Sequence, residues 1–143
     1  MAELARKLTP KDLQFTYDDY LQLHDDGKRY EIIEGELFMT PAPNIQHQNI
    51  LSELGERLRK FVLKKHLGIV LYAPCDVILS KTNVVQPDIL YVSKINQAII
   101  TDKNIQGAPD LVVEITSATT LERDLVLKKK LYGKYGVKEY WIV

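Results

Sequence analysis

Two hydrophobic periods follow one another in the chain, and this change of period restricts the fold more than any other feature of the sequence. Residues 29–33 and 36–40 alternate polar and apolar side chains on either side of Glu34-Gly35, which is typical of a β-hairpin. From Asn44 to Gly68 the apolar side chains recur every three or four positions, which predicts one long helix that Asn44 caps. An all-helical or an all-β fold does not accommodate both patterns, so we expect a mixed α/β fold.

The other segments predict further strands and two more helices. A short helix over residues 17–24 precedes the hairpin. A C-terminal helix begins at residues 117–120, carries apolar side chains as far as Tyr135 and ends at Gly136. Strands are expected at residues 69–73, 76–79, 84–92, 111–115 and 139–143, and a helical turn is expected at residues 95–99. This order predicts an α/β (α+β) sandwich around one sheet.

The chain is expected to form a single domain over residues 1–143. It has no repeat, no low-complexity tract and no linker rich in Pro, Gly or Ser. The sequence ends at Tyr140-Trp-Ile-Val143, inside an expected apolar strand that would ordinarily be followed by more chain or a polar cap. We therefore expect a domain that is truncated at its C-terminal end.

Composition and charge exclude several classes of protein. The 19 basic and 19 acidic residues cancel, so the chain is not a polycation, although segments 53–66 and 122–138 are basic and segment 11–36 is acidic. Cys75 is the only cysteine, which excludes an intramolecular disulfide and a cysteine-rich zinc module. The apolar runs are too short for a signal peptide or a membrane span. These features predict a soluble cytoplasmic protein without a membrane partner.

Two carboxylates lie inside apolar segments, where burying a charge is costly. Asp88 follows Pro87 within segment 84–92, and Glu114 interrupts segment 111–115. One such carboxylate can pair with a surface lysine, but two on neighbouring strands would lie about 5 Å apart and repel unless a cation separates them. Oxygen ligands of this kind select Mg²⁺ or Mn²⁺. A metal-bound water beside a phosphodiester provides what hydrolysis requires, so the pair predicts a metal-dependent phosphodiesterase.

Lys128 is the candidate for a positive charge beside this pair. Asp124, Lys128 and Tyr132 form an i, i+4, i+8 stripe on the C-terminal helix, which directly follows the strand of Glu114. An ammonium near the metal can orient the attacking water or stabilise negative charge on the phosphorus centre. The alternative is a solvated basic helix face, because residues 128–130 are three consecutive lysines.

Several segments of the chain resemble, in order and spacing, those of the Uma-two family, once a domain of unknown function. They are Tyr30-Glu-Ile-Ile-Glu-Gly-Glu36, His47, Gln86-Pro-Asp-Ile-Leu90, Gly107-Ala-Pro-Asp-Leu-Val-Val-Glu-Ile115, Arg123-Asp124 with Lys128 and Tyr132, and Tyr135-Gly-Val-Lys-Glu-Tyr-Trp-Ile-Val143. A proline before Asp88, and Glu114 on the next strand, are also similar to the PD…(D/E)xK motif of restriction-endonuclease-like nucleases. The resemblance covers most of residues 30–143.

This resemblance implies a restriction-endonuclease-like core, a mixed central sheet flanked by helices with a metal site at one edge. Asp88 and Glu114 would hold Mg²⁺ or Mn²⁺. The usual motif has a lysine two residues after the second acid, but Thr116 stands there, so Lys128 would take that role. The resemblance also implies Glu31 as a further acid, although the other two glutamates of the hairpin compete with it. His47 could bind a phosphate or act as a base, or it could simply cap its helix.

Together these observations predict a metal-dependent endonuclease acting on nucleic acid, with DNA as the expected substrate. Basic residues on two helices are expected to contact backbone phosphates rather than base edges, or else to form solvated faces. These residues are Arg57, Lys60, Lys64 and Lys129. Because cleavage of both strands of a duplex usually requires two sites, we expect a homodimer.

Two other functions remain open from the sequence. A binding or regulatory module that keeps the nuclease fold without activity is favoured by the missing lysine after Glu114. A metal-free hydrolase could instead use Asp88 and Glu114 as acid and base. DNA nicking that depends on a divalent metal separates the nuclease from both alternatives.

Overall fold

Signals in the sequence set the ends of the two main helices. The side chain of Asn44 accepts a hydrogen bond of 2.7 Å from the backbone N–H of His47 and caps α3 (Ile45–Lys64). Gly136 ends α4 (Lys129–Tyr135) with a φ of +89°, a left-handed conformation that glycine adopts without strain. Both caps are those that the sequence predicts.

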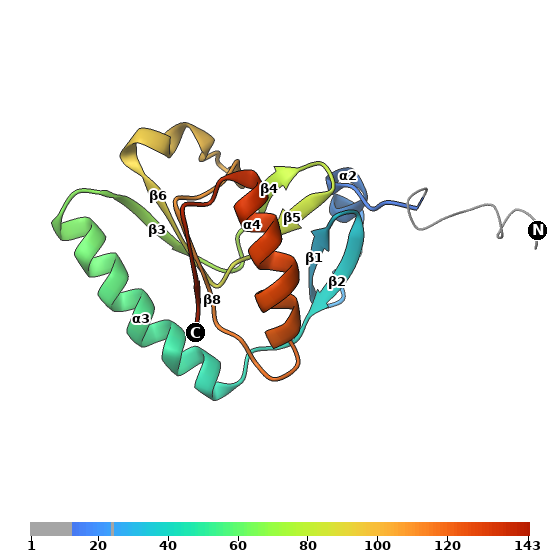
Figure 1. The fold of residues 1–143 in the computed structure, drawn as a ribbon, viewed down its shortest axis with the longest axis horizontal. Coiled ribbons are helices and arrows are strands. Elements are labelled where there is room, and N and C mark those ends of the chain that lie inside the picture. Colours follow the sequence, from blue (N-terminus) through green and yellow to red (C-terminus); the bar gives the residue numbers. More distant parts are fainter. Residues whose placement is uncertain (1–12, 24) are drawn as a thin grey trace, which may run out of the picture.

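The computed structural model describes residues 13–23 and 25–143 (Figure 1). Helix α2 (Tyr17–Leu21) and the hairpin of β1 (Arg29–Ile33) and β2 (Glu36–Thr40) precede α3. The elements between α3 and α4 are β3 (Gly68–Tyr72), β4 (Val77–Ser80), β5 (Asn83–Val85), β6 (Ile89–Ser93), a 3₁₀ helix (Lys94–Ile99), β7 (Ile105–Gln106), β8 (Leu111–Glu114) and a π-helical segment (Arg123–Lys128). Strand β9 (Glu139–Ile142) follows α4.

The strands form two mixed sheets. One sheet has the order β2-β1-β5-β4-β7, and only the β4–β7 pair in it is parallel. The other sheet has the order β3-β6-β8-β9, with a parallel pair between β8 and β9. Mixed sheets flanked by helices confirm the predicted fold class, but the strands divide into two sheets where the sequence analysis expected one.

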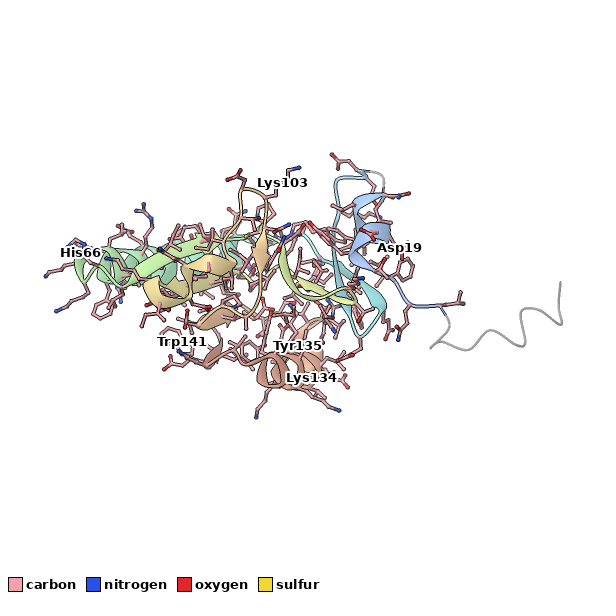
Figure 2. All side chains as sticks on the ribbon, turned by 90° about the horizontal axis from the view of Figure 1, so that it is seen from above. Asp19, His66, Lys103, Lys134, Tyr135 and Trp141 are labelled. Carbon is pink, nitrogen blue, oxygen red and sulfur yellow. The ribbon has the colours of Figure 1, made fainter. Side chains whose placement is uncertain are left out.

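Alternation along β6 and β8 separates two hydrophobic clusters. Ile89 and Val113 pack with Val62 of α3 on one face of the four-stranded sheet. Leu90 packs with Leu131 of α4 on the opposite face, where residues of the five-stranded sheet complete the core. Figure 2 shows this layering from above, with the side chains of α4 at one edge of the molecule and the loop before β7 at the other. The even-numbered positions of β6 and β8 therefore face α4, and this parity decides where the acidic residues point.

The predicted continuous strand over residues 84–92 is wrong. The chain leaves the first sheet after β5 (Asn83–Val85) and enters the second sheet at β6 (Ile89–Ser93). Pro87 lies between them, and because proline has no N–H it cannot donate to a ladder inside a sheet. The change of sheet therefore occurs at the residue that cannot take part in either ladder.

The C-terminal helix also differs from its prediction. Residues 118–120 form a turn, and a π-helical segment (Arg123–Lys128) precedes the regular helix α4. Leu121 and Leu125, which the sequence placed on the apolar face, are exposed. The wider winding instead buries Asp124 and Lys128, and π-helical turns are frequent at functional sites.

Smaller differences concern the ends of elements. Helix α2 ends at Leu21, and His24 of its expected range, like the N-terminal residues 1–12 searched for a signal peptide, lies outside the described residues. Gly68 opens β3 rather than closing α3, and β7 was not predicted. None of the helices in the described ranges is long and apolar enough to cross a membrane.

Replacing Asp110 with asparagine is expected to lower the free energy of unfolding by about 1 kcal/mol at pH 7. Its carboxylate accepts a 2.7 Å hydrogen bond from the N–H of Ser93 and lies 3.4 Å from the ammonium of Lys138. Burial alone would raise the pKa of Asp110, but the donors from Ser93, Asn96 and Lys138 outweigh it and lower the pKa below its usual value. Urea unfolding at pH 7 and at acidic pH measures the effect.

The sign of the pH dependence follows from this lowered pKa. The carboxylate contributes stability above the unfolded-state pKa of about 3.9, and the contribution is lost as pH falls through the folded-state pKa. The difference in free energy of unfolding between the wild type and Asp110→Asn should therefore become smaller as the pH is lowered. An equal difference in this free energy at pH 7 and at acidic pH would contradict this role of Asp110.

Candidate active site

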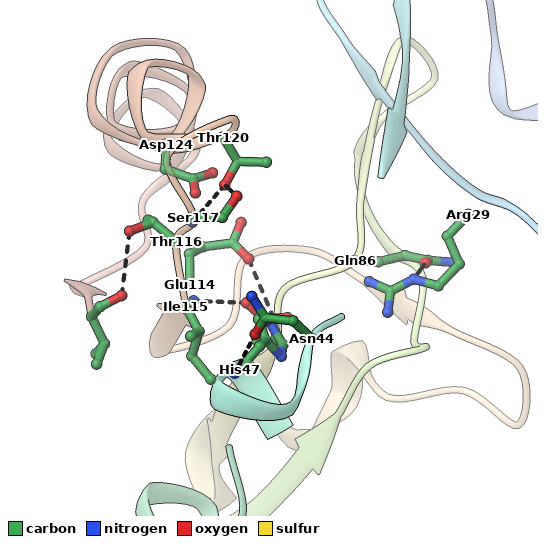
Figure 3. Close-up of polar contacts among 12 residues, drawn as sticks. Arg29, Asn44, His47, Gln86, Glu114, Ile115, Thr116, Ser117, Thr120 and Asp124 are labelled. Carbon is green, nitrogen blue, oxygen red and sulfur yellow. Dashed lines mark hydrogen bonds and ion pairs between the residues drawn. The ribbon is translucent and has the colours of Figure 1, made fainter. Parts of the chain in front are cut away.

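The fold places Asp88 and Glu114 side by side on the face that is turned towards α4. In the β6–β8 pair Ile89 lies opposite Val113, so the next residues outward, Asp88 and Glu114, lie opposite each other. The N–H of Asp88 donates to Oε1 of Glu114 at 3.3 Å, and the N–H of Ile115 donates to Oδ2 of Asp88 at 2.7 Å (Figure 3). The backbone of each strand thus holds the carboxylate of the other.

Lys128 brings a buried ammonium to these acids. Its Nζ lies 2.9 Å from Oε1 of Glu31 and 3.7 Å from Oδ1 of Asp124, and it also donates to Oε2 of Glu114. The side chain is only 6% exposed, so the solvated lysine that the sequence left open is not the conformation observed. One ammonium among three carboxylates leaves this cluster with net negative charge.

Glu31 reaches the cluster because β1 pairs with β5. Ile32 lies opposite Val84, which brings Glu31 next to the chain that leads from β5 to Asp88. The N–H of Gln86 donates to Oε2 of Glu31 at 2.8 Å, and the glutamate is 1% exposed. Of the three glutamates in the hairpin, the structure brings Glu31 to the acids.

Burial shifts the pKa values in the cluster. Burial, together with the charges of Glu31 and Asp88, raises the pKa of Glu114, although Lys128 opposes this. Burial likewise raises the pKa of Asp124 against the effect of Lys128. For Lys128, burial alone would lower the pKa, but the surrounding carboxylates outweigh it and hold the pKa above its usual value. The lysine is therefore protonated at neutral pH, and Glu114 takes up a proton more readily than an exposed glutamate.

His47 joins the site from the first turn of α3. Its Nε2 lies 3.1 Å from Oδ1 of Asp88. Its Nδ1 and the hydroxyl of Thr40 are buried and have no hydrogen-bond partner among the described residues. Unpaired buried polar atoms are uncommon, and both of these residues line the same cleft.

This cleft has a volume of about 530 Å³. Its walls contain the five predicted site residues, namely Glu31, His47, Asp88, Glu114 and Lys128. Arg29 and Arg123 also line it. A cavity of about 800 Å³ between α3 and the four-stranded sheet is lined largely by apolar side chains such as Phe61 and Trp141 and holds none of the predicted site residues.

The predicted phosphate-contacting residues are not brought to the cleft. Arg57, Lys60, Lys64 and Lys129 are exposed, and none of them lines it. Arg57 follows His47 by ten residues along α3, which corresponds to about 15 Å at the usual rise of a helix. These side chains can meet nucleic acid only at a distance from the acids.

Asp88 and Glu114 fit a divalent cation by the chemistry of their oxygens. No three His, Cys, Asp or Glu side chains in the described ranges are arranged to share an ion. The two carboxylates nevertheless offer hard oxygen ligands, and each oxygen that accepts one hydrogen bond keeps a second lone pair. The excess negative charge around Lys128 would also be offset by a cation. The pair therefore fits Mg²⁺ or Mn²⁺.

Two features of the cleft were not predicted, namely the presence of Arg29 in its lining and the contact that Tyr132 makes. Tyr132 was part of the predicted stripe, but only the structure shows its hydroxyl donating to Oε2 of Glu114 at 3.2 Å. Arg29 lies two residues before Glu31, and side chains two apart on a strand share a face. That period would have indicated Arg29 once Glu31 was accepted as a site residue.

Comparisons with known proteins address the family and the fold. The family model Uma2, described as "Putative restriction endonuclease", matches residues 17–143. The chain is also similar to a crystal structure described as "a putative nuclease belonging to DUF820" from Anabaena variabilis, with 21% sequence identity and a TM-score of 0.76. This likeness covers 90% of this chain and 73% of that chain, and at this identity it shows the fold. No curated protein matches the chain.

Proposed function

Because the chain belongs to the Uma2 family, we propose that it is a metal-dependent endonuclease that hydrolyses phosphodiester bonds of DNA. The observation that carries this proposal is the convergence of Asp88, Glu114 and Lys128 in one cleft. Two adjacent carboxylates and one protonated amine supply the groups that phosphodiester hydrolysis needs. Stability alone does not call for an ammonium buried among carboxylates, because well-packed apolar side chains of similar volume would stabilise the fold as much or more.

Asp88 and Glu114 are the proposed ligands of Mg²⁺ or Mn²⁺. Such an ion, when bound, lowers the pKa of its water and polarises the phosphate. The backbone N–H groups of Asp88 and Ile115 hold the two carboxylates in place. Tyr132 donates a hydrogen bond to Oε2 of Glu114, the oxygen that also accepts from Lys128, so the position of that proposed ligand does not depend on Lys128 alone.

Lys128 is proposed to stabilise the negative charge that develops on the phosphate. Lys128 lines the cleft together with the acids, and its raised pKa keeps the ammonium charged at neutral pH. Glu31 and Asp124 hold the ammonium from two further sides. This arrangement fixes the charge before the substrate arrives, which is how preorganised groups lower an activation barrier.

His47 is proposed to position Asp88. Its Nε2 contacts the carboxylate, and Asn44 fixes the first turn of α3 that carries the ring. His47 lines the cleft, and its buried Nδ1 has no hydrogen-bond partner among the described residues.

A homodimer is part of the proposal. The described chain contains one set of these acids, and hydrolysis of both strands of a duplex is simplest with two sites related by a twofold axis. Light scattering of the purified protein, with and without DNA, measures this state directly.

The experiment that tests the function is incubation of the purified protein with supercoiled plasmid, linear DNA and single-stranded RNA. Each substrate is combined with Mg²⁺, with Mn²⁺ and with EDTA. Nicking of the plasmid that requires the metal supports the proposal. Cleavage that persists in EDTA supports the metal-free hydrolase instead. Binding of DNA without cleavage under any condition supports an inactive binding module, and cleavage of RNA alone corrects the substrate.

A further inference from the structure

We propose that Arg29, held in orientation by Gln86, binds a phosphate of the nucleic acid strand that occupies the cleft. This inference rests on the proposed nuclease function and names a phosphate-binding residue that lies apart from the acids. It begins from the position of Arg29 on β1, two residues before Glu31 and on the same face of the strand. Arg29 lines the cleft together with Asp88 and Glu114.

Gln86 holds the guanidinium by one nitrogen. Its Oε1 accepts a hydrogen bond from Nε of Arg29 at 3.0 Å. Its Nε2 donates to Oδ1 of Asp76 at 2.8 Å and to the hydroxyl of Tyr20 at 2.9 Å. Because a carboxylate only accepts and a guanidinium only donates, the amide has one orientation that satisfies both partners. Gln86 is 8% exposed, so this contact is shielded from competing water.

Residues of α2 support the contact between Gln86 and Asp76. Tyr20 donates to Oδ1 of Asp76 at 3.0 Å, and Tyr17 lies with its hydroxyl 3.5 Å from the other carboxylate oxygen. The chain of contacts therefore runs from α2 through Asp76 and Gln86 to Arg29. A side chain supported in this way loses little conformational freedom when it binds a ligand.

The terminal nitrogens of Arg29 are left for a ligand. Within the described residues the guanidinium makes its side-chain hydrogen bond through Nε and forms no ion pair with a carboxylate. The nearest acid along the strand, Glu31, is already paired with Lys128 and with the N–H of Gln86. Figure 3 shows the guanidinium turned towards the side of the cleft where His47 and Glu114 lie. The half-buried guanidinium of Arg29, which has no counter-ion among the described residues, is therefore suited to bind an anion in the cleft.

A phosphate is the anion that best fits these donors. The planar guanidinium offers two parallel N–H groups that match two oxygens of one phosphate, which an ammonium cannot do. Arg29 lines the same cleft as Asp88 and Glu114, so an anion bound by its guanidinium shares the space that these acids border. The phosphate that Arg29 holds is therefore the one under attack or its neighbour on the same strand.

The test uses labelled oligonucleotide duplexes in which the bonds cut by the wild type have been mapped. Single methylphosphonates, which lack the phosphate charge, replace one phosphate at a time around a mapped bond. We expect Arg29→Gln to reduce kcat/KM on unmodified DNA about tenfold or more, because a charge-assisted pair is lost. One methylphosphonate should reduce the wild-type rate by a similar factor and leave the Arg29→Gln rate almost unchanged. Arg29→Lys should lie between the two proteins, since it keeps the charge but not the paired donors.

The controls separate the possible failures. Arg59→Gln, on the exposed surface of α3, removes the same charge far from the cleft and should cut as the wild type does. Equal rates for Arg29→Gln and wild type would overturn the inference and leave the nuclease function intact. The same conclusion would follow if every methylphosphonate reduced the rates of Arg29→Gln and wild type by the same factor. Failure of the wild type itself to cut any bond would overturn the function, and the role of Arg29 with it. If Arg29→Gln is shown by thermal unfolding to be misfolded, the same comparison is made with Arg29→Lys.

Discussion

Replacing Asp88 with asparagine is expected to lower metal-dependent nicking of supercoiled DNA by at least about 100-fold, because a proposed metal ligand is lost. The fold should persist, since the amide oxygen of asparagine can still accept the hydrogen bond from the N–H of Ile115. The measurement is the initial nicking rate in Mg²⁺ and in Mn²⁺, together with the thermal unfolding curve of each protein.

Asp102→Asn provides the matched control, because Asp102 is exposed in the turn before β7 and away from the cleft. It should nick DNA at the wild-type rate. An Asp88→Asn protein that is folded and nicks DNA as fast as this control would remove Asp88 from the metal site. Equal loss in both variants would instead indicate a general effect of lowering the negative charge.

Replacing Lys128 with methionine is expected to lower the free energy of unfolding by about 3–5 kcal/mol at pH 7 and to abolish nicking. The variant leaves Glu31, Glu114 and Asp124 buried without the ammonium that lies between them. Because Lys128 has a raised pKa, its contribution to stability is fully present below the usual lysine pKa of about 10.4 and is lost only above the folded-state value. The wild type therefore keeps it throughout the neutral range.

The pH dependence of the stability of Lys128→Met distinguishes the effect of the unpaired carboxylates from the effect of lost packing. In Lys128→Met the excess negative charge can be relieved only when the carboxylates take up protons. The loss in free energy of unfolding relative to the wild type should therefore be smaller at pH 5 than at pH 8. A deficit that is the same at both pH values would point to packing. Urea unfolding of both proteins at the two pH values provides the data.

Two further variants complete the comparison. Lys129→Met changes the exposed neighbouring lysine and should alter stability by less than about 0.5 kcal/mol. The triple variant Glu31→Gln, Glu114→Gln and Lys128→Met removes the main charges together and should recover most of the stability but none of the activity. Recovery of activity in the triple variant would contradict the catalytic roles of these residues.

Much of the candidate site could be predicted because its signals are local. Asp88 and Glu114 are charged residues inside apolar segments of the sequence, which marked both as candidates. The β6–β8 pairing brings them opposite each other. The stripe of Asp124, Lys128 and Tyr132 singled out one lysine of three consecutive ones, and this lysine is the buried one. The winding that buries the stripe was not predicted, because a π-helical segment has no sequence signal comparable to a cap.

The partners of these residues could not be predicted, because their contacts depend on how the two sheets pack. Arg29 carries no mark in the sequence that distinguishes it from the other basic residues, and its proposed role rests on the hydrogen bond to the amide of Gln86. The basic residues of α3 looked like better phosphate ligands, yet Arg57 lies far along the helix from the cleft. A count of charges along the chain does not reveal which of them face a common space.

The amino-acid sequence by itself determined the hairpin, the long helix and the caps at Asn44 and Gly136, because periods and caps act over a few residues. Only the tertiary structure decided that Lys128 meets Glu31, 97 residues away in the chain. That contact requires the chain to change sheets at Pro87 and α4 to pack against residues of both sheets. Such long-range packing is a property of the whole core rather than of any segment.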